Sequence, residues 1–245
     1  SFDRLVRRVL GGADLRLLAA LVRAPQFGVG VAARAGPVQA ALLRAARVGV
    51  PLGQDMAARL AGWVLGQGWG VVPAQWWPLE GPAAAEEALA RGTVQLLAWG
   101  DPLLTRLERE GALRLLVDLR HLQQSQRLLG APLLCACLAV APAAFDTHGE
   151  ALRHLLLALR RTLAWLHTAE SVDLARHADL AGLAHDRAGF LRVLERLRAT
   201  YSVEPAVDPA AVRQSLRLLA SLPGGVAYQA ADPQRLLPPR AWSAV

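Results

Sequence analysis

The sequence predicts an α/β protein with a parallel sheet and a helical C-terminal part. Its 245 residues, 53% of them apolar, are enough to bury a substantial core. Short apolar runs alternate with helical stretches as far as about residue 142, and such alternation with short loops is typical of parallel α/β proteins. From about residue 143 the helical pattern takes over.

Seven apolar runs bounded by turn residues predict strands, at 15–22, 28–33, 47–50, 75–79, 95–99, 114–118 and 133–140. Helices are marked by a residue–proline pair at the start, at 81–82, 101–102 and 208–209, and the first two end at Gly92 and Gly111. Further helices are predicted over 150–167, 187–200 and 209–221. The first of these carries six leucines on one face: Leu152, Leu155, Leu156, Leu159, Leu163 and Leu166.

The charge of the chain is positive but dispersed. All 27 basic residues are arginine, and the formal net charge is +7. The arginines are spread over helix faces instead of forming one stripe, so we expect no nucleic-acid partner. Because the chain contains no lysine, it cannot be a P-loop nucleotide hydrolase or a Schiff-base enzyme.

Cysteines and hydropathy say little about compartment. Cys135 and Cys137 stand two apart in a buried-looking strand, beyond comfortable disulfide reach, and we expect both to be core thiols. The longest apolar run, 131–145, is too short for a membrane span and contains two prolines. The first residues resemble an amphipathic helix and not a signal peptide.

No catalytic or metal motif stands out. Residues 28–33, GVGVAA, fit a dinucleotide-binding pattern, but the run reads as a strand of small residues that allow close packing. Asp173 and His177, followed by Asp179, His185 and Asp186, could suggest a metal site. No second ligand pair is spaced to complete it, so we expect neither metal nor cofactor, and no enzymatic activity.

Two strand ends carry the candidate ligand residues. After the strand at 47–50, Gly53, Gln54 and Asp55 precede a helix whose free backbone N–H groups could hold a ligand, although Asp55 could equally serve only as the helix cap. After the strand at 95–99, Trp99 is expected as a wall and Asp101 as a polar anchor, because ligands of open α/β sheets bind at the carboxyl ends of strands. Asp101 could instead be only a cap. The carboxylates of Asp55 and Asp101, if both face the same ligand, favour a cationic ligand over an anion.

Tryptophans are dense over residues 69–77. Trp76 and Trp77 are adjacent in a predicted strand, so their side chains point to opposite faces. We expect that one of them meets an interface or the other lobe, with Trp69 close by.

Four stretches, taken in order, resemble one family. They are GADLRLLAALVRAPQFGVGVAAR (12–34), ARVGVPLGQDMAARLAGWVL (46–65), LEGPAAAEEALARGTVQLLAWGDPLLTRLEREG (79–111) and FDTHGEALRHLLLALRRTLAWLHTAES (145–171). The chain is thereby similar to the NMT1/THI5-like (SsuA/TauA-like) substrate-binding proteins, the solute receptors of ABC importers for sulfonate, nitrate, bicarbonate and thiamine pyrimidines.

The resemblance implies a type II periplasmic-binding-protein fold with two lobes and a ligand cleft. Residues 1–33 plus 143–245 would form the first lobe, and residues 34–142 the second. Family members begin with further strand–helix units, so the first lobe is expected to be incomplete. The sequence also departs from the family at Gln95, at Gly100, which interrupts a Trp-acidic-Pro motif, and at Asp55, where small hydroxyl residues are usual.

The resulting expectation is a non-enzymatic component that binds a small polar or heteroaromatic ligand for an ABC importer. Its ligand residues would be Gln26, Gly53, Gln54, Asp55, Trp99 and Asp101. Its protein partner would be an ABC permease or another protein that completes the first lobe, and its location periplasmic by resemblance, or cytoplasmic if no leader exists. The alternatives are a degenerate scaffold that serves as a subunit of a larger complex and, third, an enzyme similar to the fungal pyrimidine synthases.

Overall fold

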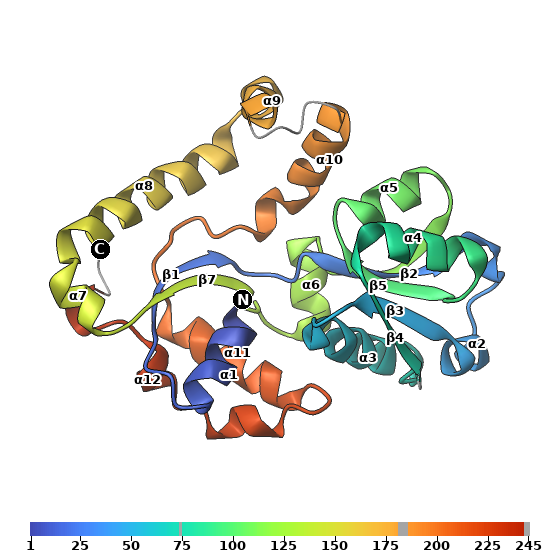
Figure 1. Ribbon diagram of the computed structural model, residues 1–245, viewed down its shortest axis with the longest axis horizontal. Coiled ribbons are helices and arrows are strands. Elements are labelled where there is room, and N and C mark those ends of the chain that lie inside the picture. Colours follow the sequence, from blue (N-terminus) through green and yellow to red (C-terminus); the bar gives the residue numbers. More distant parts are fainter. Residues whose placement is uncertain (74, 181–185, 243–245) are drawn as a thin grey trace. The chain divides into compact units, whose positions relative to one another are not determined.

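The chain folds into two compact units, which the computed structural model describes over residues 1–73, 75–180 and 186–242 (Figure 1). Unit 1 comprises Ser1–Pro25, His121–His177 and Arg196–Val245, and unit 2 comprises Gln26–Arg120 and Ala178–Glu195. The α/β fold class is as predicted. In the described part of the chain, no helix combines the length and the apolar character that a membrane span needs.

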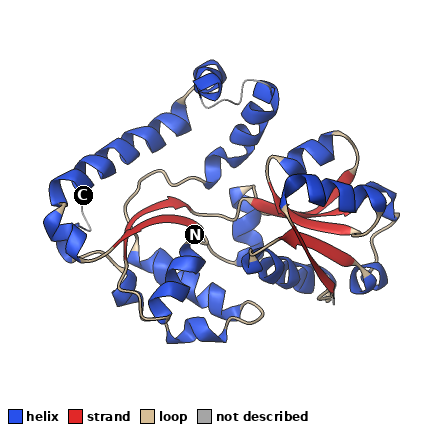
Figure 2. Cartoon of the chain, in the orientation of Figure 1, coloured by secondary structure: helices blue, strands red, loops and turns tan. Residues whose placement is uncertain are grey.

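Unit 2 is built on a five-stranded sheet with helices on both sides (Figure 2). Its strand order is β4-β3-β5-β2-β6. The strands are β2 (Phe27–Ala32), β3 (Arg47–Pro51), β4 (Gln75–Leu79), β5 (Leu96–Gly100) and β6 (Leu113–Asp118). Strand β3 pairs in parallel with β4 and β5, as predicted, whereas β2 runs antiparallel to both β5 and β6. The expectation of a wholly parallel sheet was therefore wrong for β2.

Small residues in β2 allow this close strand packing. A Cβ atom on Gly30 would lie 2.2 Å from Cδ2 of Leu113, and one on Gly28 would lie 2.8 Å from the carbonyl oxygen of Val117. Because Gly28 and Gly30 lie within a paired strand, they do not form the phosphate-binding turn of a dinucleotide site. The reading of GVGVAA as a closely packed strand is confirmed.

The helices of unit 2 are α2 (Ala40–Ala45), α3 (Asp55–Trp69), α4 (Gly81–Arg91) and α5 (Leu103–Arg109), with a short 3-10 turn at Ala33–Ala35. Leu97 and Trp99 of β5 belong to a core cluster with residues of α4 and α5. Alternate residues of the same strand, Leu96 and Ala98, are fully buried as well. Strand β5 is thus covered on both faces, as expected for the centre of an α/β sheet.

Unit 1 contains a two-stranded antiparallel sheet of β1 (Arg16–Val22) and β7 (Ala136–Val140) surrounded by helices. These are α1 (Phe2–Leu10), α6 (Leu122–Leu129), α7 (Ala143–Thr147), α8 (Gly149–Thr168), α11 (Pro209–Ser221) and α12 (Pro233–Leu236). Helices α9 (Ser171–Leu180) and α10 (Arg187–Leu197) and the 3-10 turns at Arg198–Thr200, Val226–Ala230 and Arg240–Trp242 complete the chain. The helical C-terminal part is as predicted.

Two details of unit 1 bear on the sequence expectations. The first concerns the leucines predicted on one face of α8. Leu156 and Leu163 are buried, but Leu155 is 41% exposed.

The second concerns the two cysteines. Both cysteines are free, as expected, but each residue is only half-buried, so the expectation of core thiols holds in part. Burial raises the pKa of Cys135 to about 12, and the Sγ atom lies 3.3 Å from the carbonyl oxygen of Leu133.

The boundaries of the two units differ from the predicted lobes. The prediction placed residues 1–33 with 143–245, yet β2 lies in the sheet of unit 2, paired on both edges. It placed residues 121–142 in the second lobe, yet β7 pairs with β1 in unit 1. The chain passes between the units after Pro25, Arg120, His177 and Glu195. Strand pairing, which the sequence does not reveal, decides these boundaries.

Candidate functional site

The six predicted ligand residues lie at one edge of the unit 2 sheet. Because β3 and β5 are parallel neighbours, the turn at 52–54 and Asp101 both follow strand ends at that edge. Strand β2 runs the opposite way and begins there, with Phe27 paired to Gly100. Gln26 immediately precedes it, and a Cβ on Gly100 would lie 3.2 Å from the carbonyl oxygen of Gln26. The topology therefore brings these residues to the same end of the unit 2 sheet.

The turn between β3 and α3 is the open part of this edge. Residues Leu52, Gly53, Gln54 and Asp55 are all exposed, and Gly53 adopts a positive φ of 72°. Gln54 is the N-cap of α3, and its side chain makes no capping hydrogen bond. The interpretation of Asp55 as the helix cap was wrong, since Asp55 is the first helical residue. The N-terminus of α3, with its partial positive charge, is thus flanked by a carboxylate in the first turn.

Asp101 lies beneath this edge, with its side chain only 1% exposed. One carboxylate oxygen, Oδ1, accepts hydrogen bonds from the backbone N–H of Thr105, at 2.9 Å, and from Nη1 of Arg120, at 2.7 Å. The bond to Thr105 holds the first turn of α5, in agreement with the helix-capping alternative. The other oxygen, Oδ2, is buried without a hydrogen-bond partner in the described part of the chain.

Arg120 is the centre of a buried charge network that the sequence reading missed. Its side chain is 0% exposed, and Nε and Nη2 donate to the two carboxylate oxygens of Asp118 at 2.8 and 3.0 Å. Nη1 also donates to Oγ1 of Thr105, at 3.1 Å. Burial by itself lowers the pKa of Arg120, but the hydrogen bonds that Arg120 donates to Asp118 and the charges of Asp101 and Asp118 raise it overall. The guanidinium therefore stays charged, and it pairs with both carboxylates and, at 3.7 Å, with the partly exposed Glu108.

This network changes the role expected for Asp101. A carboxylate that is buried and paired with an arginine offers no exposed oxygen to a cationic ligand. Of the two carboxylates expected to face a cationic ligand, only that of Asp55 is exposed. The only sequence signal for the network was Asp118 at a strand end with Arg120 two residues on, and its partners Asp101 and Thr105 are remote in sequence.

Trp99 is also a structural residue. It is 7% exposed and packs in the core cluster with Leu97, Leu103 and Leu104. Trp99 was expected to form a wall of a ligand site, but its indole ring is too deeply buried to contact a ligand at the surface. A strand buried on both faces lacks the alternation that would reveal which side meets solvent.

The other tryptophans of this region lie on the edge strand β4. Trp76 packs on α3, where a Cβ on Gly62 would lie 3.3 Å from its Cζ2 atom. Trp77 is 43% exposed, with the guanidinium of Arg47 at 5.8 Å from its ring centroid. Trp69, the last residue of α3, is half-buried. The opposite orientation of Trp76 and Trp77 agrees with the prediction, and an interface at Trp77 stays a prediction.

The residues weighed as metal ligands do not assemble in the part of the chain that can be described. A ring nitrogen of His177 lies 2.9 Å from the backbone oxygen of Asp173, and its ring packs 4.8 Å from that of Trp165. Asp186 accepts from the backbone N–H of Gly189 at 3.0 Å. His185 and the side chain of Asp179 lie outside the described residues. No group of three potential ligands occurs among the residues that were placed.

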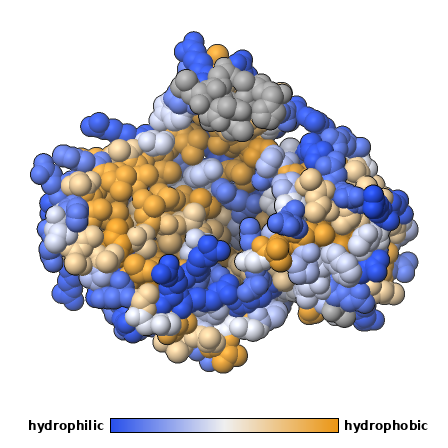
Figure 3. Space-filling view, viewed as in Figure 1, coloured by the Kyte–Doolittle hydropathy of each residue, from blue (hydrophilic) through white to orange (hydrophobic). Residues whose placement is uncertain are grey.

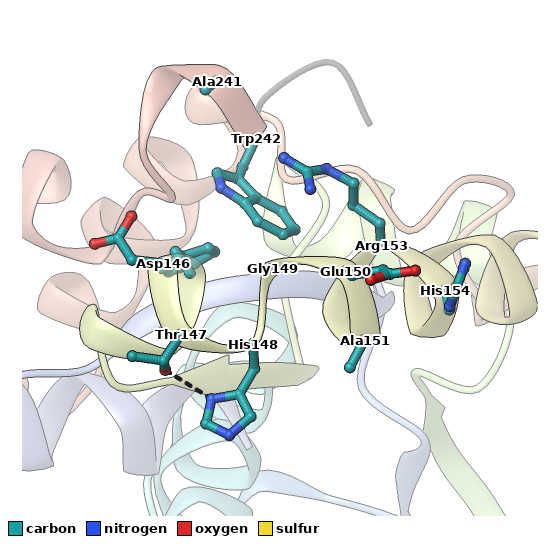
Figure 4. A pocket seen from close by; sticks show the side chains of 11 residues that line it. Asp146, Thr147, His148, Gly149, Glu150, Ala151, Arg153, His154, Ala241 and Trp242 are labelled. Atoms are coloured by element: carbon teal, nitrogen blue, oxygen red, sulfur yellow. Dashed lines mark hydrogen bonds between the residues drawn. The ribbon is translucent and has the colours of Figure 1, made fainter.

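A separate hollow of about 850 Å³ lies in unit 1, at the start of α8 (Figure 4). The ring of Trp242 forms one side of it, packed edge-on against Phe145 at 5.1 Å with the Arg153 guanidinium at 4.8 Å. His148 and Thr147 lie on another side, with Nδ1 and Oγ1 at 2.7 Å. This hollow shares no residue with the sheet-edge site and was not predicted.

Comparison with known proteins identifies the fold. No protein-family model matches the chain, and no curated protein matches its sequence. Solved structures do match. One is a protein from Bordetella bronchiseptica RB50, with a TM-score of 0.79 and 21% identity over 99% of this chain and 77% of that chain. Another is the periplasmic aliphatic sulphonate binding protein SsuA from Escherichia coli, with a TM-score of 0.67 and 19% identity over 87% of this chain and 69% of that chain.

A third match is the desulfurization enzyme DSZB, with a TM-score of 0.60 and 16% identity over 94% of this chain and 78% of that chain. The chain therefore has the α/β fold of the substrate-binding proteins of ABC transporters, as the sequence predicted. At these identities the similarity establishes fold, and the same fold carries an enzyme among these neighbours.

Proposed function

We propose that the chain is a non-enzymatic solute-binding component of an ABC importer, acting outside the cytoplasmic membrane. The observation that carries this proposal is the exposed turn Leu52–Asp55 at the carboxyl end of β3, where α3 begins without a side-chain cap. Backbone N–H groups at such a helix start bind polar ligand groups. The fold shared with the sulfonate-binding protein supports the same class of function.

The ligand is a small polar molecule held by Gly53, Gln54 and Asp55, with Gln26 at the neighbouring strand start. Trp99 and Asp101 support the site from beneath and do not contact the ligand, because both side chains are buried. The Asp55 carboxylate next to the helix start opposes a fully anionic ligand, whereas a zwitterion can place an amine near Asp55 and its anionic group on the N–H groups.

An enzymatic role is less well supported. The thiols of Cys135 and Cys137 lie in unit 1, and burial raises the pKa of both, so little reactive thiolate forms near neutral pH. Nucleophile–base pairs in hydrogen-bond contact do not occur among the described residues of the β3–α3 turn.

Calorimetric titration tests this proposal directly. The probes are an aliphatic sulfonate and its amino-substituted, zwitterionic counterpart, each titrated into wild type and into Gln54→Ala. We expect the zwitterion to bind and the affinity to fall in the variant, with Gln67→Ala as the control at an exposed position near the other end of the same helix. Heat changes that are absent with both probes, or equal in all three proteins, would contradict the proposal.

A second candidate is a degenerate binding-protein scaffold that serves as a subunit of a larger complex. The burial of Trp99 and Asp101, which commits two expected ligand residues to the core, is the observation that favours it. Native mass spectrometry of the protein purified from its own cells separates the candidates. A bound small molecule supports the solute receptor, whereas a stoichiometric protein partner without a small molecule supports the subunit.

A further inference from the structure

A second hollow in unit 1 lies between α1 and the segment 230–236. Its volume is about 260 Å³, and its lining is mostly apolar. The apolar members include Val6, Val9, Leu10 and Leu236, and the charged members are Asp232 and Arg235. The hollow shares no residue with the sheet-edge site or with the hollow at the start of α8, so it is a separate cavity.

The floor of this hollow is buried and apolar. Val6, Val9 and Leu236 are 0%, 8% and 1% exposed, whereas Leu10 is 37% exposed. An apolar cavity of about 150 Å³ is large enough to hold benzene. The hollow therefore has room for a branched aliphatic or small aromatic side chain, together with the polar groups that carry it.

A polar cluster outside the lining joins the two walls of the hollow. The hydroxyl of buried Tyr228, in the 3-10 turn Val226–Ala230, donates a hydrogen bond to one carboxylate oxygen of Asp3 in α1. Nη2 and Nε of Arg7 donate to the other oxygen of Asp3, at 2.6 and 3.2 Å. Because the 3-10 turn leads directly into α12, these contacts set the shape of the hollow before a ligand binds.

The two charged side chains lie at the start of α12. Asp232 is the N-cap residue, and its Oδ1 atom accepts a hydrogen bond from the backbone N–H of Gln234 at 2.9 Å, so Oδ2 is left for a further donor. Arg235, three residues on, is exposed and forms no ion pair among the residues that the structure describes. Side chains at these two positions lie close together at a helix start. Figure 3 likewise shows hydrophilic side chains beside hydrophobic ones around α1 on the visible face of unit 1.

We propose that this hollow binds a free apolar α-amino acid, such as leucine. The apolar side chain lies against Val6, Val9 and Leu236. The α-carboxylate pairs with the guanidinium of Arg235, whose planar N–H groups match a carboxylate, and the α-ammonium pairs with the carboxylate of Asp232. The amino acid is a second ligand, distinct from the solute proposed for unit 2.

Other classes of ligand fit the hollow less completely. A neutral apolar molecule would take water away from Asp232 and Arg235 without replacing it, which costs free energy. A monoanion with an apolar body would pair with Arg235 but would bring a like charge to Asp232. An internal peptide segment can insert an apolar side chain, but its backbone carries no charge. An apolar amino acid uses the floor and both charges.

Calorimetric titration of the full chain with L-leucine tests the proposal. Three analogues each lack one of the recognised groups: isocaproate lacks the amine, isoamylamine lacks the carboxylate, and glycine lacks the apolar side chain. We expect leucine to bind, and each analogue to bind at least about 10-fold more weakly, because each loses one of the three contacts.

Two substitutions and two controls locate the site. Arg235→Gln removes the guanidinium at an exposed position, and Ala231→Leu fills the hollow without removing a charge; each should weaken leucine binding by roughly 10-fold. Arg217→Gln, at an exposed position of α11 outside the hollow, should leave the affinity unchanged. Gln54→Ala, which alters the unit 2 site, should leave it unchanged as well. Circular dichroism verifies that each variant is folded.

The outcomes that overturn the proposal are distinct from those that overturn the proposed function. Absence of leucine binding, equal affinity for leucine and any of the three analogues, or an affinity that neither Arg235→Gln nor Ala231→Leu changes would contradict an amino acid site here. A loss of leucine binding in Gln54→Ala would place the amino acid in unit 2 and would overturn the proposal too. The sulfonate and its zwitterionic counterpart are judged by Gln54→Ala alone, so the two proposals can fail separately.

Discussion

The guanidinium of Arg120 lies 2.7 Å from the carboxylate of Asp101, with both side chains shielded from solvent. This pair joins the residue after β5 to a residue just past β6, at the sheet edge where the candidate site lies. The charge of Asp101, which the sequence suggested for ligand binding, thus joins the loops that follow β5 and β6.

Replacement of Arg120 should destabilise unit 2 strongly. Arg120→Met leaves the carboxylates of Asp101 and Asp118 buried without their cation, and removing one partner of a buried charge network costs about 3–5 kcal/mol. The free energy of unfolding in urea, followed by circular dichroism, measures this loss. The control is Arg106→Ala, which removes a half-exposed ion pair in which Nη1 of Arg106 donates to Oε1 of Glu86 at 2.8 Å. The free energy of unfolding should fall by only about 0–1 kcal/mol in this control. Equal losses in the two variants would contradict the importance of the network.

Replacement of Asp101 separates a structural role from a ligand role. Asp101→Asn keeps an acceptor oxygen for the Thr105 N–H but removes the charge opposite Arg120, so stability should fall by about 1–3 kcal/mol. The affinity for the zwitterionic probe, measured by calorimetry at a temperature where the variant is folded, should be unchanged. A large drop in affinity with unaltered stability would restore Asp101 as the ligand anchor.

The carboxylate of Asp55 should set the charge preference of the site. Asp55→Ser removes a negative charge from the first turn of α3, where it is exposed. An anionic aliphatic sulfonate should then bind more tightly by roughly 3-fold to 10-fold, because the helix N-terminus favours anions once the like charge is gone. Glu87→Ser, on the exposed surface of α4, serves as the control for a general change in net charge. A sulfonate affinity that does not respond to either substitution would place the ligand elsewhere.

Two glycine-to-alanine substitutions should have opposite effects. Gly30→Ala would place a methyl group 2.2 Å from Cδ2 of Leu113, and such overpacking costs about 1–3 kcal/mol. Gly68→Ala, within α3 and with open space around the added Cβ, should stabilise the protein by about 0.5–1 kcal/mol. Thermal unfolding of the two variants distinguishes them by the sign of the shift in Tm. Equal shifts would show that β2 is not closely packed.

The buried thiol of Cys135 should make stability fall at alkaline pH. Burial raises its pKa in the folded protein from 9.0 to about 12, so the unfolded chain loses this proton first. The folded state then holds more protons than the unfolded state between these two values, and the free energy of unfolding decreases as the pH rises above about 9. Below about pH 8 the thiol is protonated in both states and contributes no pH dependence.

The measurement compares wild type with Cys135→Ala. Urea unfolding at pH 8 and at pH 10 should show a larger decrease for wild type, because alanine cannot ionise. If the decrease is the same in both proteins, Cys135 is not buried as a neutral thiol.

Local signals in the sequence predicted most secondary-structure elements, but not the partners of each strand. The proline after Gly81 and the glycine at position 92 bound α4 as expected, because both signals act on adjacent backbone. The antiparallel direction of β2 depends on pairing with β5 and β6, more than 60 residues away in sequence. The Arg120 network was missed for the same reason, since its members come from separate elements. The sequence showed which residue types occupy the candidate site, but it did not show that the side chains of Trp99 and Asp101 are buried.

The segment that carries the unit 2 sheet has closely spaced ends. Phe27 accepts a hydrogen bond through its carbonyl oxygen from the backbone N–H of Leu119 at 3.1 Å, so the segment 26–120 starts and finishes at neighbouring points of one sheet. A segment whose two ends meet can be cut out of a gene, replaced or inserted into another protein without disturbing its own strand order. Residues 26–120, which carry all five strands of the unit 2 sheet, meet this requirement of closely spaced ends, and the second segment of unit 2, Ala178–Glu195, contributes no strand to that sheet.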